Sequence, residues 1–228
     1  MKPIKTALFC LSLALPSAAL AAQAPSTYAT PATVTFQFDR PGLHIPKYSF
    51  QLHEDGTVDY HAEEVIAAPP NGPVETKPID HRLTITHSTA NTVFKTARAL
   101  DHFNLTCEST AKNIAKTGNK TLIYKAADGT GQCTYNYSEN KDVQLLTDIF
   151  QSLAYTQDEG RKLDFLHRFD RLGLDAETTE LVQALKDHRA IEIGTISASL
   201  QSLVDDTAVM LRVRQRAATL LEQAKQAE

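Results

Sequence analysis

The chain has 228 residues, of which 42% are hydrophobic and 22% charged, and its formal net charge at pH 7 is −4. This length suits one large domain or two small ones. The mildly acidic balance argues against nucleic acid and anionic lipid as partners, because binding to either requires basic patches on the surface.

The first 21 residues have the organisation of a secretory signal peptide. MKPIK is a short basic start, TALFCLSLALPSAAL is an apolar run, and residues 19–21 supply a small-x-small cleavage pattern. The apolar run is too short for a good membrane-spanning helix. We therefore expect cleavage after Ala21, with Ala22 as the alternative, and a periplasmic or secreted protein without stable membrane insertion.

Export leaves two cysteines, Cys107 and Cys133, in the mature chain. An even number of cysteines in an oxidising compartment predicts a disulfide, worth about 3 kcal/mol in the chain-entropy model. Two free buried thiols are the alternative. The pair is too widely spaced for a C-x-x-C redox motif, and two cysteines alone make no zinc site.

Residues 22–32 are small, polar and Pro-containing, and they predict a flexible lead to a domain over residues 33–139. TVTFQFD alternates apolar and polar residues, as a half-buried strand does. YSFQLHEDGTVDYHAEE predicts a hairpin around the loop 54–56, with Leu52 facing Val58 and Phe50 facing Tyr60.

The rest of this domain is predicted as a loop, a strand, a helix and a second hairpin. IAAPPNGPVETKPID, residues 66–80, has four prolines and no period, and predicts a long loop. HRLTITH predicts a short strand, and Ser88 or Thr89 caps a helix that ends near His102. KTLIYKA and QCTYNYS predict a hairpin around ADGTG.

From residue 140 to residue 228 the pattern is helical throughout and predicts five short helices. The capping box TQDE, Thr156 with Glu159, predicts the start of the second helix, which buries Leu163, Leu166 and Phe169. The later helices are predicted to begin at Asp175, near Ile193, and at Asp205 or Asp206. LGLDAE and SLVDDT recur once, so a stacked-helix repeat and an irregular bundle both stay open.

Three short tags invite comparison with penicillin-binding proteins and serine β-lactamases: S-x-x-K at Ser109, K-T-G at residues 116–118, and S-E-N at residues 138–140. In that family the serine begins a helix, and K-T-G comes last, on a core strand. Here K-T-G precedes S-E-N and sits in a predicted turn. Order, spacing and context all disagree with a catalytic assignment, so no catalytic residue is predicted.

Two groups of polar side chains form the candidate ligand or partner surface. His53, Asp59 and His61 share the polar side of the predicted hairpin, but the two histidines are roughly 13 Å apart, which excludes one shared metal ion. Asp164, His167 and Asp170 recur at every third position of a predicted helix. They could hold an ion only with ligands from another element, and a solvated helix face is the alternative. We predict neither a metal site nor a cofactor.

The segments PGLHIPKYSFQLHEDGTVDYHAEE, CESTAKNIAKTGNKTLIY with GQCTYNYSENK, and HRFDRLGLDAE together resemble a family of uncharacterised secreted bacterial proteins with no assigned activity. The resemblance covers most of the mature chain. It implies export and a two-part layout, and it assigns no catalytic residue.

The sequence thus predicts an α+β protein: an N-terminal antiparallel sheet with one packed helix, followed by an all-helical C-terminal part. We expect an exported, non-enzymatic protein-interaction module of the cell envelope, whose partner is another envelope or secreted protein. The alternative is a small-ligand-binding protein or hydrolase, with its site between the sheet and helical parts.

Overall fold

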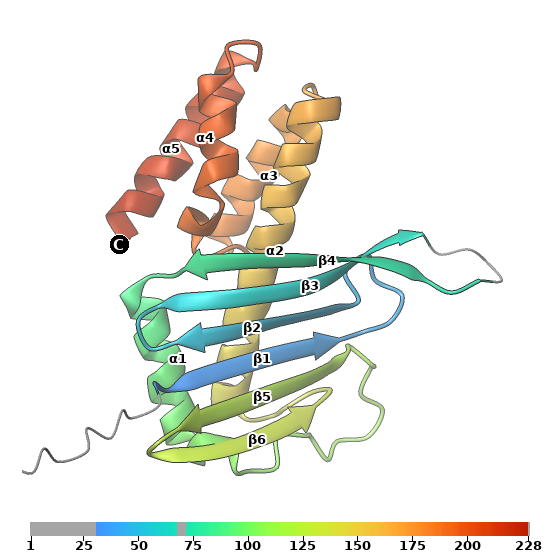
Figure 1. Cartoon of the computed structure of the whole chain (residues 1–228), viewed down its shortest axis with the longest axis vertical. Coiled ribbons are helices and arrows are strands. Elements are labelled where there is room, and N and C mark those ends of the chain that lie inside the picture. Colours follow the sequence, from blue (N-terminus) through green and yellow to red (C-terminus); the bar gives the residue numbers. More distant parts are fainter. Residues whose placement is uncertain (1–30, 68–71, 228) are drawn as a thin grey trace, which may run out of the picture.

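The structure is a computed structural model and describes residues 31–67 and 72–227. The predicted signal peptide and nearly all of the predicted lead lie outside the described residues. The described chain contains a six-stranded antiparallel sheet and five α-helices (Figure 1), with the first helix placed between two strands in the chain order. The predicted α+β character is confirmed.

The strands form one sheet in the order β4-β3-β2-β1-β5-β6. Their bounds are β1 Thr33–Asp39, β2 Lys47–His53, β3 Thr57–Ala67, β4 Glu75–Thr84, β5 Asn119–Ala126 and β6 Gly129–Tyr135. β1 is central and pairs with both β2 and β5. The chain therefore builds β1 to β4 as a meander and, after the first helix, adds β5 and β6 on the other side of β1.

The predicted β2–β3 hairpin is confirmed in its register. Leu52 pairs with Val58 and Phe50 pairs with Tyr60, and all four side chains are buried on the helix side of the sheet. Gly56 adopts φ +84° in the connecting loop, and a Cβ there would lie 2.9 Å from the Ile85 carbonyl oxygen. The turn therefore requires glycine both for its backbone conformation and for the close approach of the chain.

The predicted loop over residues 66–80 is wrong in its second half. β4 begins at Glu75, and its pairing with β3 includes Pro78 opposite Glu63. β4 is an edge strand, so Pro78 can lie where the missing N–H leaves no ladder hydrogen bond unmade. The prolines led to a loop prediction where the chain forms a strand, and the edge position of that strand allows it to contain Pro78.

The helices are α1 His87–Ala99, α2 Lys141–Phe169, α3 Leu174–Lys186, α4 Ser197–Asp205 and α5 Leu211–Ala227, with 3-10 turns η1 Asp101–Phe103 and η2 Ile193–Ile196. α1 begins two or three residues earlier than predicted and ends at Ala99, before the predicted end near His102. Its cap is Thr86, whose hydroxyl accepts a hydrogen bond from the Thr89 N–H at 3.3 Å.

The prediction of separate helices on either side of Thr156 is wrong, because α2 runs unbroken through 29 residues. Thr156 does not cap a helix. Its hydroxyl lies 2.7 Å from the Ile191 carbonyl oxygen and accepts a hydrogen bond from the Ile191 N–H at 3.1 Å. A polar residue inside the helix is thus explained by a contact with a segment 35 residues later in the chain.

α2 belongs to two hydrophobic cores. Its first half buries Val143, Leu146, Phe150 and Leu153 against the sheet and α1, and Phe150 stacks on Phe36 with ring centroids 5.0 Å apart. From Leu163 onward it packs against α3, α4 and α5 in a second core. The change of packing therefore falls within α2, well after residue 140.

The two similar hexapeptides occupy different places in their helices. LGLDAE spans the α2–α3 turn and the first residues of α3, whereas SLVDDT closes α4. Structural repeats place equivalent residues at equivalent points of each unit. This pair of segments therefore does not mark a structural repeat, and the helical part is an irregular bundle.

The predicted disulfide is confirmed between Cys107 and Cys133, whose Cα atoms lie 5.8 Å apart. It joins the loop after η1 to β6. Asp101, His102 and Phe103 in η1 all have left-handed backbone angles, with φ of 49°, 57° and 70°. Such angles are costly for L-residues, so the disulfide and the packing of buried Phe103 hold a turn that is not favoured locally.

Candidate functional site

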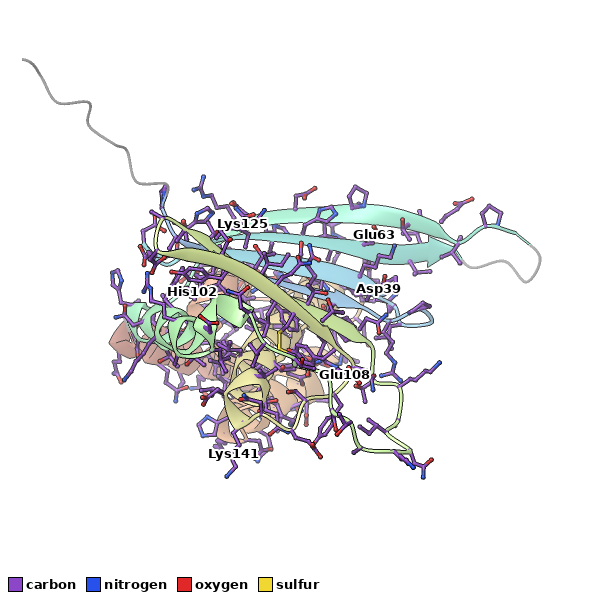
Figure 2. All side chains as sticks on the ribbon, turned by 90° about the horizontal axis from the view of Figure 1, so that it is seen from below. Asp39, Glu63, His102, Glu108, Lys125 and Lys141 are labelled. Atoms are coloured by element: carbon purple, nitrogen blue, oxygen red, sulfur yellow. A yellow bond between two sulfur atoms is a disulfide. The ribbon has the colours of Figure 1, made fainter. Side chains whose placement is uncertain are left out.

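The face of the sheet opposite the helices carries His53, Asp59 and His61. Figure 2 shows α1 and α2 beneath the other face, and no described helix or strand lies over this one. His53 Nε2 lies 3.1 Å from Asp59 Oδ2, whereas His61 Nδ1 lies 2.6 Å from Asp80 on β4. The two histidines therefore have separate acidic partners, and the sheet does not bring all three residues into one site.

The second predicted group is also divided. His167 Nε2 lies 2.9 Å from Asp206 in the α4–α5 connection, and Arg171 lies 3.3 Å from the same carboxylate oxygen. The hydrogen bond with His167 lowers the pKa of Asp206, and Arg171 acts in the same direction. Asp164 is exposed, and Asp170 accepts a hydrogen bond from the Gly173 N–H. This cluster ties helices together at the end of the bundle.

Metal-binding constellations are absent from the described part of the chain. Among residues 31–67 and 72–227, no group of three or more His, Cys, Asp or Glu side chains is arranged to hold an ion. Over the same residues, no helix is both long enough and apolar enough to cross a membrane. Ser109 lies in a loop, where its hydroxyl accepts the Ala111 N–H, and not at the start of a helix.

Lys120 is a buried cation that sequence reasoning missed. Burial lowers the pKa of its ammonium group. Nζ donates to the Asn136 carbonyl at 2.7 Å, and to the Thr117 hydroxyl and the Gly118 carbonyl at 3.1 Å each. All three ammonium hydrogens are used in this way, so Lys120 fastens the segment before β5 to the end of β6. It has no free donor or lone pair for a ligand.

The main hollow between the sheet part and the helical part is a cleft of about 950 Å³. It is lined by the end of β4, the start of α1, η2 and the last turns of α5. Its principal carboxylate is Glu192, which accepts hydrogen bonds from the Thr86 N–H at 2.9 Å, from the Thr86 hydroxyl at 2.8 Å and from the Thr89 hydroxyl. Glu192 thus binds the N-terminus of α1, where a negative charge is favoured by the helix dipole.

Replacement of Glu192 by Gln is expected to lower the free energy of unfolding by about 1–2 kcal/mol, because a charged acceptor at a helix N-terminus is lost. Urea unfolding at pH 7 measures this loss. Glu180→Gln is the matched control, since Glu180 is exposed on α3 and makes a surface ion pair with Arg189. Equal stability of the two variants would contradict the role assigned to Glu192.

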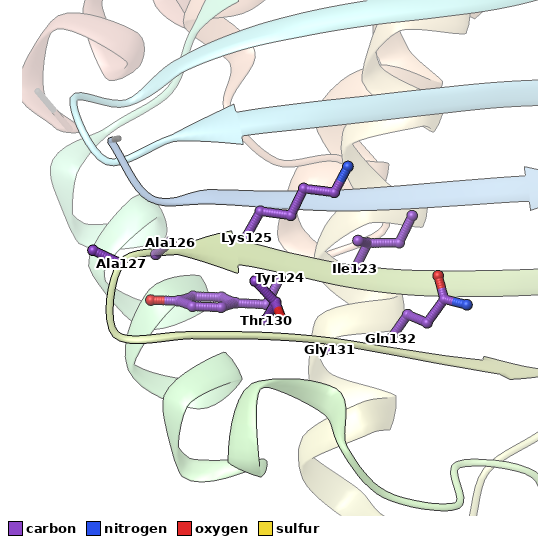
Figure 3. A pocket seen from close by; sticks show the side chains of 8 residues that line it. All are labelled: Ile123, Tyr124, Lys125, Ala126, Ala127, Thr130, Gly131 and Gln132. Carbon is purple, nitrogen blue, oxygen red and sulfur yellow. The ribbon is translucent and has the colours of Figure 1, made fainter. Parts of the chain in front are cut away.

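A second hollow, of about 610 Å³, lies along the ends of β5 and β6 (Figure 3). Its side chains do not converge: Ile123 and Lys125 extend to one side of the ribbon, whereas the Tyr124 ring lies below it, and the Tyr124 hydroxyl bonds Asp128 at 2.9 Å. The hollow therefore lacks the several converging polar groups of a small-molecule site.

The α2–α3 turn and the α4–α5 connection lie at the end of the helical bundle farthest from the sheet (Figure 1). Exposed apolar side chains lie in and beside these connections. Phe165, Phe169 and Leu172, which we call the tip patch, are 59%, 66% and 79% exposed. The two phenylalanine rings contact each other, with centroids 5.0 Å apart. Leu211, at the start of α5, is exposed at the same end of the bundle.

The prediction that Phe169 is buried is therefore wrong. The second half of α2 has apolar residues on two sides of the helix, and the second core takes only Leu163 and the partly buried Leu166. Phe165 and Phe169 are four residues apart and form a separate stripe on α2, and Leu172 lies in the turn that follows the helix. That spacing was the signal in the sequence for an apolar surface outside the core.

No protein-family model, curated protein or solved structure matches this chain. The family therefore stays open, and the resemblance to secreted bacterial proteins stays a prediction. The geometry of the chain's own residues carries the functional argument.

Proposed function

We propose that this protein is an exported, non-enzymatic interaction module that binds an envelope or secreted protein through the tip patch. The observation that carries the proposal is the exposure of two contacting phenylalanines on α2 and of a leucine in the turn that follows it. Monomeric proteins rarely expose large adjoining apolar side chains without an interaction to make. Aromatic anchors of this kind supply much of the binding energy at protein interfaces.

The charges around the tip patch suit a protein partner better than a lipid surface. Arg168 lies near the Phe169 ring, with its guanidinium carbon 5.8 Å from the ring centroid. Arg171 is engaged by Asp206, and Asp164 and Asp170 are exposed beside the patch. A mixed-charge rim around an apolar centre is typical of protein–protein interfaces. The disulfide, which forms in oxidising compartments, supports export.

The test is an in-cell crosslinking pull-down of the tagged protein, followed by mass spectrometry. The Phe165→Ser/Phe169→Ser variant is expected to capture its stoichiometric partner at about one tenth of the wild-type amount or less. The reason is that loss of an aromatic anchor costs about 2 kcal/mol or more of binding free energy. Leu145→Ser is the matched control, because Leu145 is an exposed apolar residue on the first half of α2.

Undiminished capture by the double variant would refute the tip patch as the binding surface. Charge reversals at His53, Asp59 and His61 would then test the open sheet face as the alternative location. Absence of any partner would refute the interaction module itself.

The cleft at Glu192 supports the second candidate function, binding of a small ligand between the two parts. Hydrolysis has less support, because Asp164, His167 and Asp170 do not line this cleft and Glu192 already binds α1. Filling the cleft by Gly194→Phe should abolish ligand binding while leaving partner capture at the tip unchanged.

A further inference from the structure

Two glutamates face each other in the second core, between α2 and α3. Glu159 and Glu177 are only 5% and 8% exposed. One oxygen of each carboxyl group, Oε2 of Glu159 and Oε1 of Glu177, is buried without a hydrogen-bond partner among the described residues. Lys162, one helical turn after Glu159, places its Nζ 2.6 Å from Glu177 Oε2, so the two carboxyl groups share one site and each affects the pKa of the other.

Two neighbouring carboxyl groups can hydrogen-bond to each other only if one of them carries a proton, because ionised carboxylates only accept. Burial, with Glu177 alongside, raises the pKa of Glu159 to about 8. The pKa of Glu177 is lowered even though burial acts against this, because Glu159 and Lys162 donate hydrogen bonds to it. The raised pKa of Glu159 and the lowered pKa of Glu177 favour a pair of one carboxylic acid and one carboxylate, with the proton on Glu159.

The surroundings offer little to compensate a second negative charge. On α2, Tyr155 lies beside Glu159, and Lys162 is the neighbouring cation. After α3, Arg189 lies 3.4 Å from the Tyr155 hydroxyl but is engaged by Glu180 at 2.7 Å. From η2 and α4, the side chains of Ile196 and Ser199 approach Gly160, and neither of them titrates.

We propose that the Glu159–Glu177 pair is a proton-operated latch, which holds α3 against α2 while Glu159 is protonated and weakens this contact when Glu159 ionises. Ionisation leaves two adjacent carboxylates in a largely buried site, with one lysine between them. Such a site is unfavourable for both charges. α3 then separates more readily from α2.

The sign of the pH dependence follows from the proton count. Between the ordinary glutamate pKa of 4.5 and about 8, the folded protein holds a proton on Glu159 that the unfolded chain has released. The contribution of Glu159 to the free energy of unfolding is therefore fully present below pH 4.5. It falls as the pH rises and is lost above about pH 8. The lowered pKa of Glu177 acts only at acidic pH, where stability falls as that group becomes protonated.

Thermal unfolding of the full mature chain from pH 6.5 to pH 9.5 tests the latch, with amide hydrogen exchange corrected for its intrinsic pH dependence. From pH 6.5 to pH 9.5 the Tm of the wild type is expected to fall by at least about 5 °C more than the Tm of Glu159→Gln. Protection of α3 amides should fall in the wild type and not in Glu159→Gln. Glu222→Gln, an exposed change on α5, should behave like the wild type.

The Gln variant keeps a donor toward Glu177 at every pH, so it removes the titration and preserves the hydrogen bond. Identical pH profiles for the wild type and Glu159→Gln would overturn the latch. Carboxyl-carbon NMR of the unmutated protein gives an independent result. A titration midpoint of Glu159 near 4.5 would refute the proposal even if the variant does not fold.

Discussion

Gly131→Ala is expected to lower the free energy of unfolding by about 3 kcal/mol, as overpacking against a fixed backbone does. A Cβ at this position on β6 would lie 2.4 Å from the His102 carbonyl oxygen and 2.6 Å from Asn104 Oδ1. η1 cannot retreat easily, because it is held by its buried Phe103 and by the nearby disulfide. The added methyl group therefore forces the backbone of η1 away from the sheet.

Urea unfolding monitored by circular dichroism measures this loss. Gly194→Ala is the matched control, since its Cβ would meet only the Ala224 methyl at 3.7 Å, an ordinary contact. We expect the control to change stability by less than about 0.5 kcal/mol. A Gly131→Ala protein as stable as the control would show that η1 is not closely packed against β6.

Removal of the disulfide by Cys107→Ala/Cys133→Ala is expected to cost about 3 kcal/mol, because the unfolded chain regains the freedom of a closed loop. The bond spans 26 positions in sequence. Both sulfurs lie in the core between the sheet, α1 and the first half of α2. The loss should therefore appear in β5, β6 and η1, whereas the second core should keep its protection.

Hydrogen exchange of the double variant separates these regions. Wild-type protein kept under reducing conditions is the control, and it should show the same loss in the same strands. A loss below about 1 kcal/mol, or one spread evenly over both cores, would contradict the proposed restriction of the effect to the sheet part.

Local patterns in the sequence predicted those elements whose side chains follow one period. The β2–β3 hairpin is an example, because alternation and the glycine turn together define a single register for Phe50 and Tyr60. The cysteine pair was equally predictable, since only two cysteines follow the predicted leader.

The errors arose where distant contacts outweighed local signals. Thr156 resembles a helix cap, but Ile191 satisfies its hydroxyl from another part of the chain. Pro78 suggests a loop, yet it lies in a strand because that strand forms the sheet edge. Which of the two apolar stripes on α2 enters the core depends on where α3 to α5 pack, and the tip patch was missed for this reason.

The Glu159–Glu177 pair could not be predicted from sequence either, because the two residues come from different helices and neither stands in a recognisable motif. Glu159 was instead predicted to be the second residue of a capping box with Thr156. Its burial follows only from the packing of α3 on an uninterrupted α2.

The continuity of α2 has a mechanical consequence. At a rise of about 1.5 Å per residue, a helix of this length extends about 43 Å, and it is anchored in the sheet core at one end and in the bundle core at the other. Glu192, bound to the start of α1, braces the bundle against the sheet at a second point. The long helix therefore acts as a rigid spacer. A partner bound at the tip patch is kept at a fixed distance and orientation from the sheet.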